Sequence, residues 1–520
     1  MRKRYIAFGI TGIVLAFGLT AARPYIKLAF TFADFVNPHK RGSSPDDLSN
    51  QLAEIDKGVL KSPEPIGAHS YVSSPNRDRN AYFGDLHVHT ALSYDAHAWG
   101  TTASPDHAYR FAQGESIKHP SGFDMQLKRP LDFYGVTDHG MFLGAAREAA
   151  DTSTAFSKYD VASYYHGINR NKKEHWTNQL SRQLAMLRFD VGLFQGLNDG
   201  TIDRNLITEI AQNAWKETIE AADAHYAPGN FTTFVAYEYT SWNGLGGLHR
   251  NVIFRSSDRL PKEPFTLYHS FNPEGLWDWM DGLRNQGIES LAIPHNPNVS
   301  GGQMFMLEDW AGNPLDDTYA QQRMRNEPLV EITQVKGTSE THPLLSVNDE
   351  WAGFEILDRP PDIKLDKIMG SYVRDAYLRG LAQEEKGIEN PYKFGLIGSS
   401  DTHVAASSLY EESFHSKAGV MDGKPQDRGS VPISGLRKFL MKKLFAFGTI
   451  EFDGELYING GMDKWGASGL TGVWAEENTR EAIYDAFRRK ETFATTGPRI
   501  KVRFFAGYDW TDEMLQSEDM

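Results

Sequence analysis

The chain has 520 residues, of which 40% are hydrophobic and 12% aromatic, a composition typical of a folded protein and not of a disordered one. Its formal net charge of −14 excludes a global positive field that would attract long nucleic acids, so a small substrate is favoured. The sequence contains no cysteine, which excludes thiolate metal sites and cysteine nucleophiles and leaves histidines and carboxylates as ligands for any metal ion.

The first 22 residues have the layout of an export signal. Basic residues 2–4 precede an apolar run from Tyr5 to Leu19, and the small residues Ala21 and Ala22 follow. A retained membrane anchor is the alternative, because the next stretch, YIKLAFTFADFV, stays apolar. Either interpretation predicts a periplasmic or extracellular protein, which contacts the membrane only if this segment is retained.

Residues 23–80 are rich in serine, proline, asparagine and charge, and we interpret them as a linker or loosely packed arm. From residue 81 onward, short apolar runs each end in a polar cluster and alternate with helix-like stretches. This alternation predicts parallel β/α units that close into a barrel, with the chemistry at the C-terminal ends of the strands. The apolar runs and their polar ends are DLHVHT, LDFYGVTDHG, FTTFVAYEYTSW, SLAIPHNP, LVEITQVKG and FGLIGSSDTH.

Residues 81–505 are expected to form one α/β domain, with a C-terminal tail at 506–520. Uneven strand spacing predicts inserts at about 150–230, 296–328 and 404–432. Long excursions on barrel loops are usually lids or substrate pockets, and simple decoration is the alternative. Near the end, TREAIYDAFRRKETFATTGPRI predicts a helix capped at Thr479, followed by a strand.

The segment YFGDLHVHTALSYDA carries polar side chains at alternate positions of a predicted strand. Successive strand residues face opposite ways, so Asp85, His87 and His89 share one face. The segment GSSDTH repeats this pattern with Asp401 and His403. A half-exposed edge strand could explain one such pair, but not polar clusters at the ends of successive strands. The simplest interpretation is a polynuclear metal centre, with these candidates: His87, His89, Asp95, Asp138, His139, Glu238, His249, His295, Asp401 and His403.

These segments, taken in order, resemble the polymerase and histidinol phosphatase (PHP) superfamily. The sequences of the segments YFGDLHVHTALSYDA and GGLHRNVIF resemble those of the branch catalogued as DUF3604. The resemblance spans about residues 81 to 500 and implies an irregular (β/α)7 barrel with up to three divalent ions at the strand C-termini.

The resemblance also implies a set of ligands for each ion. Glu238 would bridge the first two ions, and Asp95 stands where many members of the superfamily have histidine. The first ion would be bound by His87, His89, Glu238 and Asp401, the second by Glu238, His249 and His295, and a third by Asp95, His139 and His403.

The resemblance implies two to three ions, and imidazole and carboxylate ligands favour Mn²⁺ or Zn²⁺, or else Fe²⁺, over Ca²⁺ or Mg²⁺. We interpret Asp85 and Asp138 as partners that orient the histidine rings, with direct ligation as the alternative. Arg250, Lys336 and Arg499 could bind phosphate, or could equally be ordinary ion-pair partners. Surface or structural roles are expected for His97, His107 and His119, and no role is assigned to Glu115, Glu331 and Glu340.

The leading hypothesis is an exported, metal-dependent phosphatase that hydrolyses small phosphate monoesters, in a role similar to that of an alkaline phosphatase. Glu238, Asp401 and Arg250 would carry the chemistry, with a metal-bound hydroxide as nucleophile. The alternatives are a phosphodiesterase or nuclease on the same centre, a hydrolase of the amidohydrolase type, and a non-catalytic metal-binding surface protein. The sequence leaves the oligomeric state open.

Overall fold

The computed structural model describes residues 59–61, 75–170, 176–244, 246–357, 365–444, 449–459 and 462–516. The predicted signal or anchor at 1–22 and most of the predicted arm at 23–80 lie outside these residues. No helix in the described ranges is long and apolar enough to cross a bilayer.

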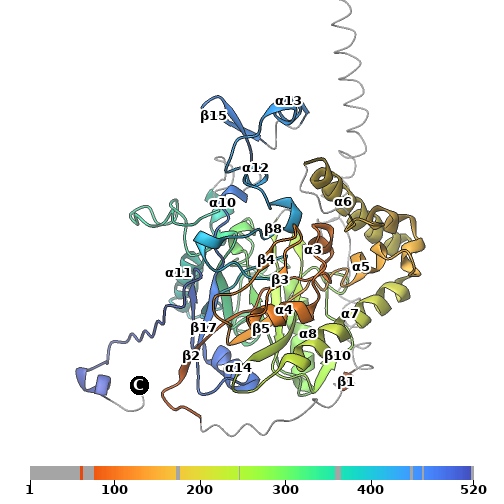
Figure 1. Ribbon diagram of the computed structural model, residues 1–520. Coiled ribbons are helices and arrows are strands. Elements are labelled where there is room, and N and C mark those ends of the chain that lie inside the picture. The colour runs from red at the N-terminus through yellow and green to blue at the C-terminus, as the bar shows by residue number, and fades with distance from the viewer. Residues whose placement is uncertain are drawn as a thin grey trace, which may run out of the picture.

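A curled, seven-stranded mixed sheet forms the centre of the molecule (Figure 1). Its strand order is β11-β9-β6-β5-β2-β17-β18, and β2, β5 and β6 run parallel to one another. The strands are β2 (Asn80–Asp85), β5 (Phe133–Val136), β6 (Thr232–Tyr239), β9 (Arg250–Phe254), β11 (Ser290–Pro294), β17 (Leu470–Ala475) and β18 (Thr492–Thr495).

The closed (β/α)7 barrel expected from the sequence is not formed as one hydrogen-bonded sheet by the described strands. β12 (Leu329–Gln334) and β14 (Gly395–Gly398) pair in parallel in a separate three-stranded sheet with β13 (Gly337–Thr338). β12 lies beside β11, and β14 lies beside β17 and β18, so this smaller sheet faces the open side of the larger one.

Two strands of the large sheet, β9 and β17, run opposite to β2, β5 and β6. β9 is antiparallel to β6 because only a short excursion joins them, with strands β7 (Trp242–Asn243) and β8 (Gly246–Gly247), and a short connection suits an antiparallel neighbour. β17 is antiparallel to both β2 and β18. The N-terminal end of β9 therefore lies at the same edge of the sheet as the C-terminal ends of β6 and β5.

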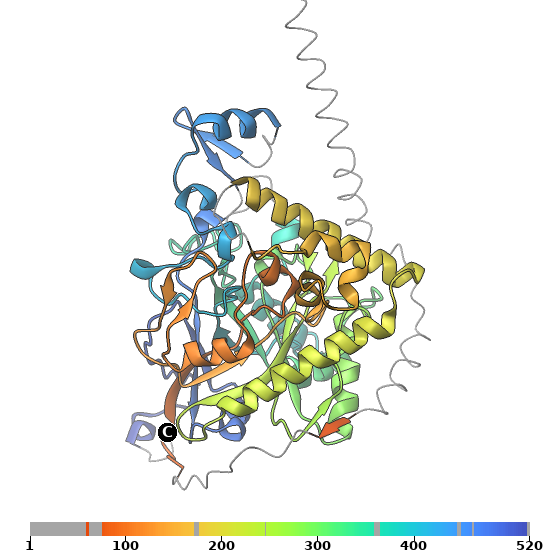
Figure 2. The same ribbon diagram turned by 45° about the vertical axis from the view of Figure 1, so that its right-hand side comes forward.

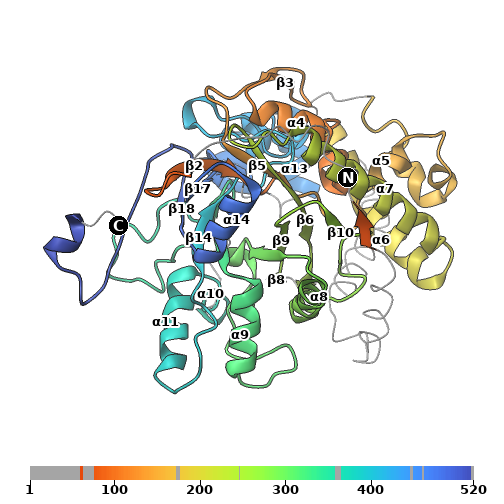
Figure 3. The ribbon, with the colours of Figure 1, turned by 90° about the horizontal axis from the view of Figure 1, so that it is seen from below.

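Helices flank the strands on several sides when the molecule is seen from below (Figure 3). Their caps agree with the sequence: Thr479 accepts a hydrogen bond from the backbone N–H of Ala482, which confirms the predicted cap, and Asn272 caps its helix in the same way. The main helices are α4 (Pro105–Ala112), α7 (Arg204–His225), α8 (Pro273–Asn285), α9 (Asp317–Asn326), α11 (Val373–Glu384) and α14 (Arg480–Arg489).

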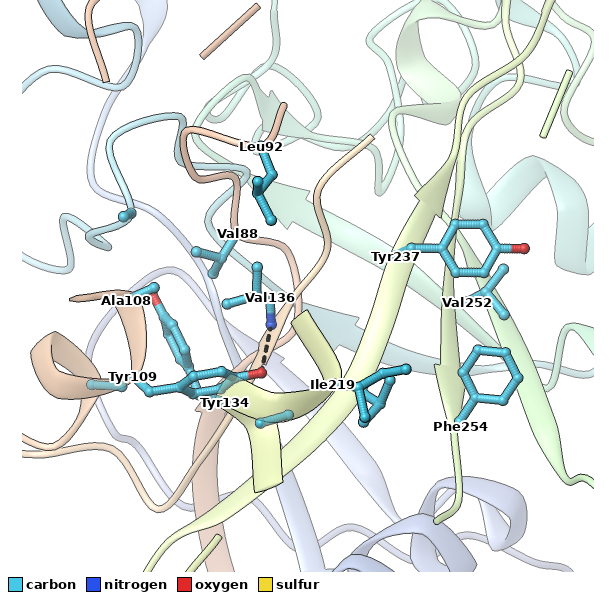
Figure 4. Close-up of a cluster of buried hydrophobic side chains, with 14 of the residues drawn as sticks. Val88, Leu92, Ala108, Tyr109, Tyr134, Val136, Ile219, Tyr237, Val252 and Phe254 are labelled. Atoms are coloured by element: carbon cyan, nitrogen blue, oxygen red, sulfur yellow. Dashed lines mark hydrogen bonds between the residues drawn. The ribbon is translucent and has the colours of Figure 1, made fainter. Parts of the chain in front are cut away.

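Strand β6 is buried along its whole length, because each of its faces packs against a different apolar cluster. Phe234 and Ala236 point into the curl of the sheet. Tyr237 points to the other side, toward the cluster in Figure 4, where the hydroxyl of Tyr109 from α4 accepts a hydrogen bond from the backbone N–H of Val136. By alternation, Glu238 shares the inward face of Phe234 and Ala236 and lies at the mouth of the curl.

The described residues between 150 and 230 are largely helical, and Figure 2 shows the two long helices of this segment, α6 (Trp176–Asp199) and α7, across the front of the molecule. α6 packs against α3 (Tyr94–Ala98) and against the 3₁₀ helix η3 (Asp160–Tyr165). The connection after β14 contains 3₁₀ turns and short helices, and above it α13 (Gly435–Leu444) and a hairpin project at the top of Figure 1.

The remaining short elements complete the described chain. They are β1 (Val59–Lys61), β3 (Ile117–Lys118), β4 (Asp124–Met125), α5 (Ala145–Ala150), η2 (Phe156–Lys158), β10 (Arg259–Pro261), η4 (Pro297–Val299), α10 (Leu365–Ile368), η5 (Glu411–Ser413), η6 (Gly419–Met421), α12 (Pro425–Arg428), β15 (Thr449–Phe452), β16 (Glu455–Ile458), η8 (Met462–Lys464) and η9 (Asp512–Gln516).

Candidate metal centre

The candidate ligands converge at one edge of the two sheets, at the ends of strands that are distant in sequence. Strand β2 runs into His87 and His89, and the backbone of Val88 between them forms a parallel bridge with Thr402. This bridge brings the first and last polar segments of the domain side by side. All nine predicted ligands come together here: His87, His89, Asp95, His139, Glu238, His249, His295, Asp401 and His403.

Four donor atoms form the first group. The Nε2 atoms of His87 and His89 lie 3.4 and 3.3 Å from Glu238 Oε2, and 3.4 and 3.5 Å from Asp401 Oδ1. Four donors arranged tetrahedrally at about 2.1 Å from one ion are separated by about 3.4 Å. The spacing of this group therefore fits a single ion at its centre.

The other carboxylate oxygen of Glu238 meets a second group of histidines. Glu238 Oε1 lies 2.7 Å from His249 Nδ1, 3.5 Å from His295 Nε2 and 3.2 Å from His139 Nδ1. Glu238 thus presents one oxygen to each group, which is the arrangement of a carboxylate that bridges two ions.

A third group lies beside His89. Asp95 Oδ2 is 2.9 Å from His403 Nε2 and 3.3 Å from His139 Nε2. The ring of His139 stands between two groups, since its Nδ1 faces Glu238 and its Nε2 faces Asp95. The spacing allows His89, His139 and His403 to share an ion as well.

Unpaired buried nitrogens test whether this cluster fits metal ions. The Nε2 atoms of His87, His89 and His295 are buried, and none has a hydrogen-bond partner among the described residues. A buried polar atom without a partner is unfavourable unless something binds it. Nitrogen and carboxylate donors aimed at common points fit divalent ions such as Mn²⁺, Zn²⁺ or Fe²⁺.

The charges within the cluster also fit metal binding. Burial alone would raise the pKa of Glu238, but His139, His295 and His249 hold it well below its usual value, so Glu238 is ionised. Burial would lower the pKa of His87, but the carboxylates of Glu331 and Asp401 raise it to about 10. Negative charge therefore dominates at His87, and a cation can take the place of its proton.

The family of the chain follows from its sequence. The family model described as "Protein of unknown function (DUF3604)" matches residues 76–520. The chain belongs to the DUF3604 family.

No curated protein matches the sequence. A solved structure from Bacteroides vulgatus, of a two-domain protein containing a predicted PHP-like metal-dependent phosphoesterase, is 12% identical with a TM-score of 0.29. That match covers 83% of this chain and 69% of the other.

In this DUF3604 protein the rings of His87 and His89 are held directly by Glu331 and Ser93, and not by the predicted Asp85 and Asp138. His87 Nδ1 lies 2.9 Å from Glu331 Oε2, and His89 Nδ1 lies 2.9 Å from the hydroxyl of Ser93, which donates to Asp138. Asp138 therefore acts on His89 through Ser93. Asp85 orients no ring, because its carboxylate accepts hydrogen bonds from the backbone N–H groups of His87 and Ser400.

Glu331 had no assigned role from sequence, although it lies on the predicted strand LVEITQ. Its carboxylate also accepts a hydrogen bond from the side chain of Gln334. The alternation of side chains within the predicted strand could have indicated this role, because it allows the side chain of Glu331 to face the same side as the histidines. Only the parallel pairing with β14 fixes that position.

Two lysines flank the first group of ligands. Lys336, a predicted phosphate-binding candidate, forms an ion pair with Asp401. Its side chain is 22% exposed, so the ammonium group lies at the site and near solvent. Lys417 was not predicted; its Nζ lies 2.9 Å from Asp401 Oδ1 and 3.0 Å from His403 Nδ1. Burial lowers the pKa of Lys417 to about 8, although Asp401 opposes this shift.

The structure does not place Arg250 or Arg499 at the cluster. Arg250 follows His249 and so points to the opposite face of β9, where its Nε donates to Glu327 over 2.8 Å. Arg499 donates to the backbone carbonyls of Arg129 and Pro130, just before β5 begins, at the edge opposite the metal ligands. The predicted phosphate-binding role is therefore wrong for both arginines.

The other histidines and glutamates set aside in the sequence lie outside the cluster. His107 closes the first turn of α4 with Ser104, and His119 stacks on Phe123. His97 is buried, with Asn169 within hydrogen-bond distance. Glu115 and Glu340 form surface ion pairs, with Arg110 and Arg374 respectively.

Proposed function

We propose that this DUF3604 protein is a metal-dependent phosphoric ester hydrolase that acts on small phosphate monoesters. The observation that carries the proposal is Glu238, whose two carboxylate oxygens face two separate groups of buried imidazole nitrogens. Two ions shared by one carboxylate are typical of enzymes that clamp the attacking and leaving oxygens of a phosphoryl transfer.

The residues that would bind the ions are those of the three groups. His87, His89, Glu238 and Asp401 would hold the first, and Glu238, His249 and His295 the second, with Asp95, His139 and His403 left for a third. When bound, such ions supply a water of lowered pKa and positive charge for the phosphate oxygens. An irregular PHP-type barrel, made by the two sheets together, remains the proposed description of the fold.

The protein's own contribution is to position these groups and to add positive charge. Glu331 and Ser93 fix the rings of His87 and His89, so that their Nε2 atoms point inward. Lys336 lies at the more open side of the first group and can bind a phosphate oxygen. Lys417, from the connection after β14, adds a second positive charge beside Asp401.

Monoesters are favoured over diesters because of this charge. A monoester dianion carries one more negative charge than a diester, and both Lys336 and Lys417 reach the same ligand, Asp401. Long nucleic acids are not expected as substrates of a chain with a net charge of −14.

The experiment is a turnover screen of the purified protein with aryl and alkyl phosphate monoesters, bis-aryl phosphate and amides. Monoester hydrolysis that is abolished by chelator and restored by Mn²⁺ or Zn²⁺ supports the proposal. Faster cleavage of bis-aryl phosphate than aryl phosphate at saturating metal points to a phosphodiesterase. Amide hydrolysis alone points to the amidohydrolase class, and metal binding without turnover of any ester points to a non-catalytic protein.

Export of the enzyme is also proposed, on the sequence of residues 1–22. Cell fractionation with an antibody to the folded domain tests this. Recovery of the full-length chain mainly in the cytosol contradicts it.

A further inference from the structure

The turn that carries Lys336 begins at a buried glutamine, Gln334, the last residue of β12. Strands β12 and β13 pair with Gln334 opposite Gly337, so Lys336 lies in the two-residue turn between them. Only 5% of Gln334 is exposed, and its amide contacts both this turn and Glu331. A buried amide needs partners for its oxygen and its nitrogen, and these two contacts supply them.

The two ends of the Gln334 amide have different partners. Its Nε2 donates a hydrogen bond to Glu331 Oε1 over 3.1 Å, and its Oε1 accepts one from the backbone N–H of Lys336, also over 3.1 Å. The neighbours fix this orientation, because a carboxylate accepts hydrogen bonds and a backbone N–H donates them. A reversed amide would present an acceptor to Glu331 and a donor to Lys336.

Glu331 connects Gln334 to the metal centre. Its other oxygen, Oε2, lies 2.9 Å from His87 Nδ1, while Nε2 of the same ring belongs to the first group of ligands. Both oxygens of this buried carboxylate are therefore engaged, one by the ring of His87 and one by the amide of Gln334. A rotation of the carboxylate that broke one contact would disturb the other.

Lys336 is held through its backbone at both ends. Its N–H donates to Gln334, and its carbonyl accepts a hydrogen bond of 3.4 Å from the side chain of Asn298. The side chain of a lysine is long and flexible, so a fixed backbone limits the places that its ammonium group can reach. In this structure the ammonium group reaches the candidate ligand Asp401.

An irregularity in β12 makes the contact between Gln334 and Glu331 possible. In a regular strand, residues three apart face opposite sides, so these two side chains would not meet. The pairing of β12 with β14 shifts its register between Glu331 and Thr333. Such bulges re-aim side chains and are frequent beside active sites. The local distortion of β12 therefore serves the contact between the two side chains.

We propose that Gln334 is a positioning residue that aligns the first group of metal ligands with Lys336. It acts on His87 through Glu331, and on Lys336 through the backbone of the turn. The inference rests on the proposed phosphoesterase function and adds to it a residue that couples metal binding to phosphate binding. Gln334 itself takes no part in the reaction.

The first test is the substitution Gln334→Met, which keeps the length of the side chain and removes both hydrogen bonds. We expect the dissociation constants for Mn²⁺ and for inorganic phosphate on the metal-loaded protein each to rise about 3- to 10-fold, the effect of losing one neutral hydrogen bond. Competition with a chelator indicator measures the first, and isothermal titration measures the second. At saturating metal and substrate, kcat should change less than about twofold, because Gln334 does not touch the substrate.

The second substitution, Gln334→Asn, separates the two contacts. An asparagine oxygen readily accepts a hydrogen bond from the backbone N–H two residues further on, so the contact with Lys336 should be kept. The amide is one methylene shorter and should no longer reach Glu331. We expect metal affinity to fall as in Gln334→Met, and phosphate affinity to stay within about twofold of that of the unmodified protein. A general loss of stability would not divide the two affinities in this way.

The matched control is Gln179→Met, because Gln179 is also buried and its amide donates to the carbonyl of Val420 and to Asp427. It should keep both affinities. Normal affinity for either ligand in Gln334→Met would overturn the coupling, as would equal losses in Gln179→Met or a loss of phosphate affinity in Gln334→Asn. Failure of the unmodified protein to hydrolyse any phosphoester would instead refute the proposed function, and the metal affinities would still decide whether Gln334 acts on His87.

Discussion

Glu238 Oε1 lies 2.7 Å from His249 Nδ1. Glu238 lies near the end of β6 and His249 directly precedes β9, the antiparallel neighbour of β6. The short excursion between β6 and β9 returns the chain to the edge it has just left, so both side chains reach the same site. With Glu238 Oε2 turned to His87 and His89, this contact makes Glu238 a residue shared by the first and second groups of candidate ligands.

Replacing Glu331 with Gln should weaken metal binding without changing the ligands themselves. Glu331 lies against the outer nitrogen of His87, and its charge increases the affinity of that ring for a cation. Loss of an outer partner of this kind typically reduces metal affinity about 10- to 100-fold. Competition with a chelator indicator measures the change. Glu340→Gln, at the surface, is the control, and equal affinities in the two variants would contradict this role of Glu331.

Metal affinity should rise with pH. The pKa of His87 in the metal-free protein is raised to about 10, so below that pH an ion must displace a proton to bind Nε2. Each proton displaced changes the apparent dissociation constant about tenfold per pH unit. Isothermal titration of the metal-free protein in buffers of different ionisation enthalpy counts the released protons. A dissociation constant that is flat between about pH 6.5 and 9 is the contrary result.

Removing Lys336 should affect substrate binding more than metal binding. A charge-assisted hydrogen bond to phosphate contributes about 1.5–3 kcal/mol, so Lys336→Met should raise KM for a monoester about 10- to 100-fold. Inhibition by inorganic phosphate should weaken in parallel. Lys216→Met, on the exposed face of α7, serves as the control. A normal KM in Lys336→Met would show that this lysine serves Asp401 alone.

Arg250 should prove structural. Its ion pair with Glu327 is buried, and Glu327 also accepts a hydrogen bond from the indole of Trp277. Arg250→Met leaves a buried carboxylate with weaker pairing, which costs about 3–5 kcal/mol of unfolding free energy, whereas Arg255→Met at the surface should cost less than about 1 kcal/mol. Denaturant titration compares the two. A stable Arg250→Met with a raised KM would restore a direct role in phosphate binding.

The sequence was sufficient to predict that the candidate ligands lie together, because their signal is local. Two polar residues separated by one apolar residue at the end of a strand, as in His87 and His89, place both side chains on one face. The fold brings every one of the nine predicted ligands into the cluster, from strand ends up to about 300 residues apart.

The residues that contact the candidate ligands from outside, and the topology of the sheet, could not be predicted from such local patterns. Lys417 comes from the segment after β14, and no local pattern in the sequence shows that it approaches the site. Arg250 was misassigned because proximity to His249 in sequence means opposite faces on a strand. The antiparallel course of β9 and β17 depends on short connections and on pairing with β2 and β6, which a reading of regular β/α alternation overlooks.

The most direct test of the central claim is the number of metal ions bound per chain in Glu238→Gln, measured by elemental analysis together with monoester turnover. Gln keeps the shape of the side chain but removes the negative charge that would reduce the repulsion between two dications. Bound metal and turnover should therefore fall together, and turnover should fall by more than about 100-fold. Glu115→Gln, at the surface, should behave like the unmodified protein. A full metal complement with near-normal turnover in Glu238→Gln would contradict the two-metal centre.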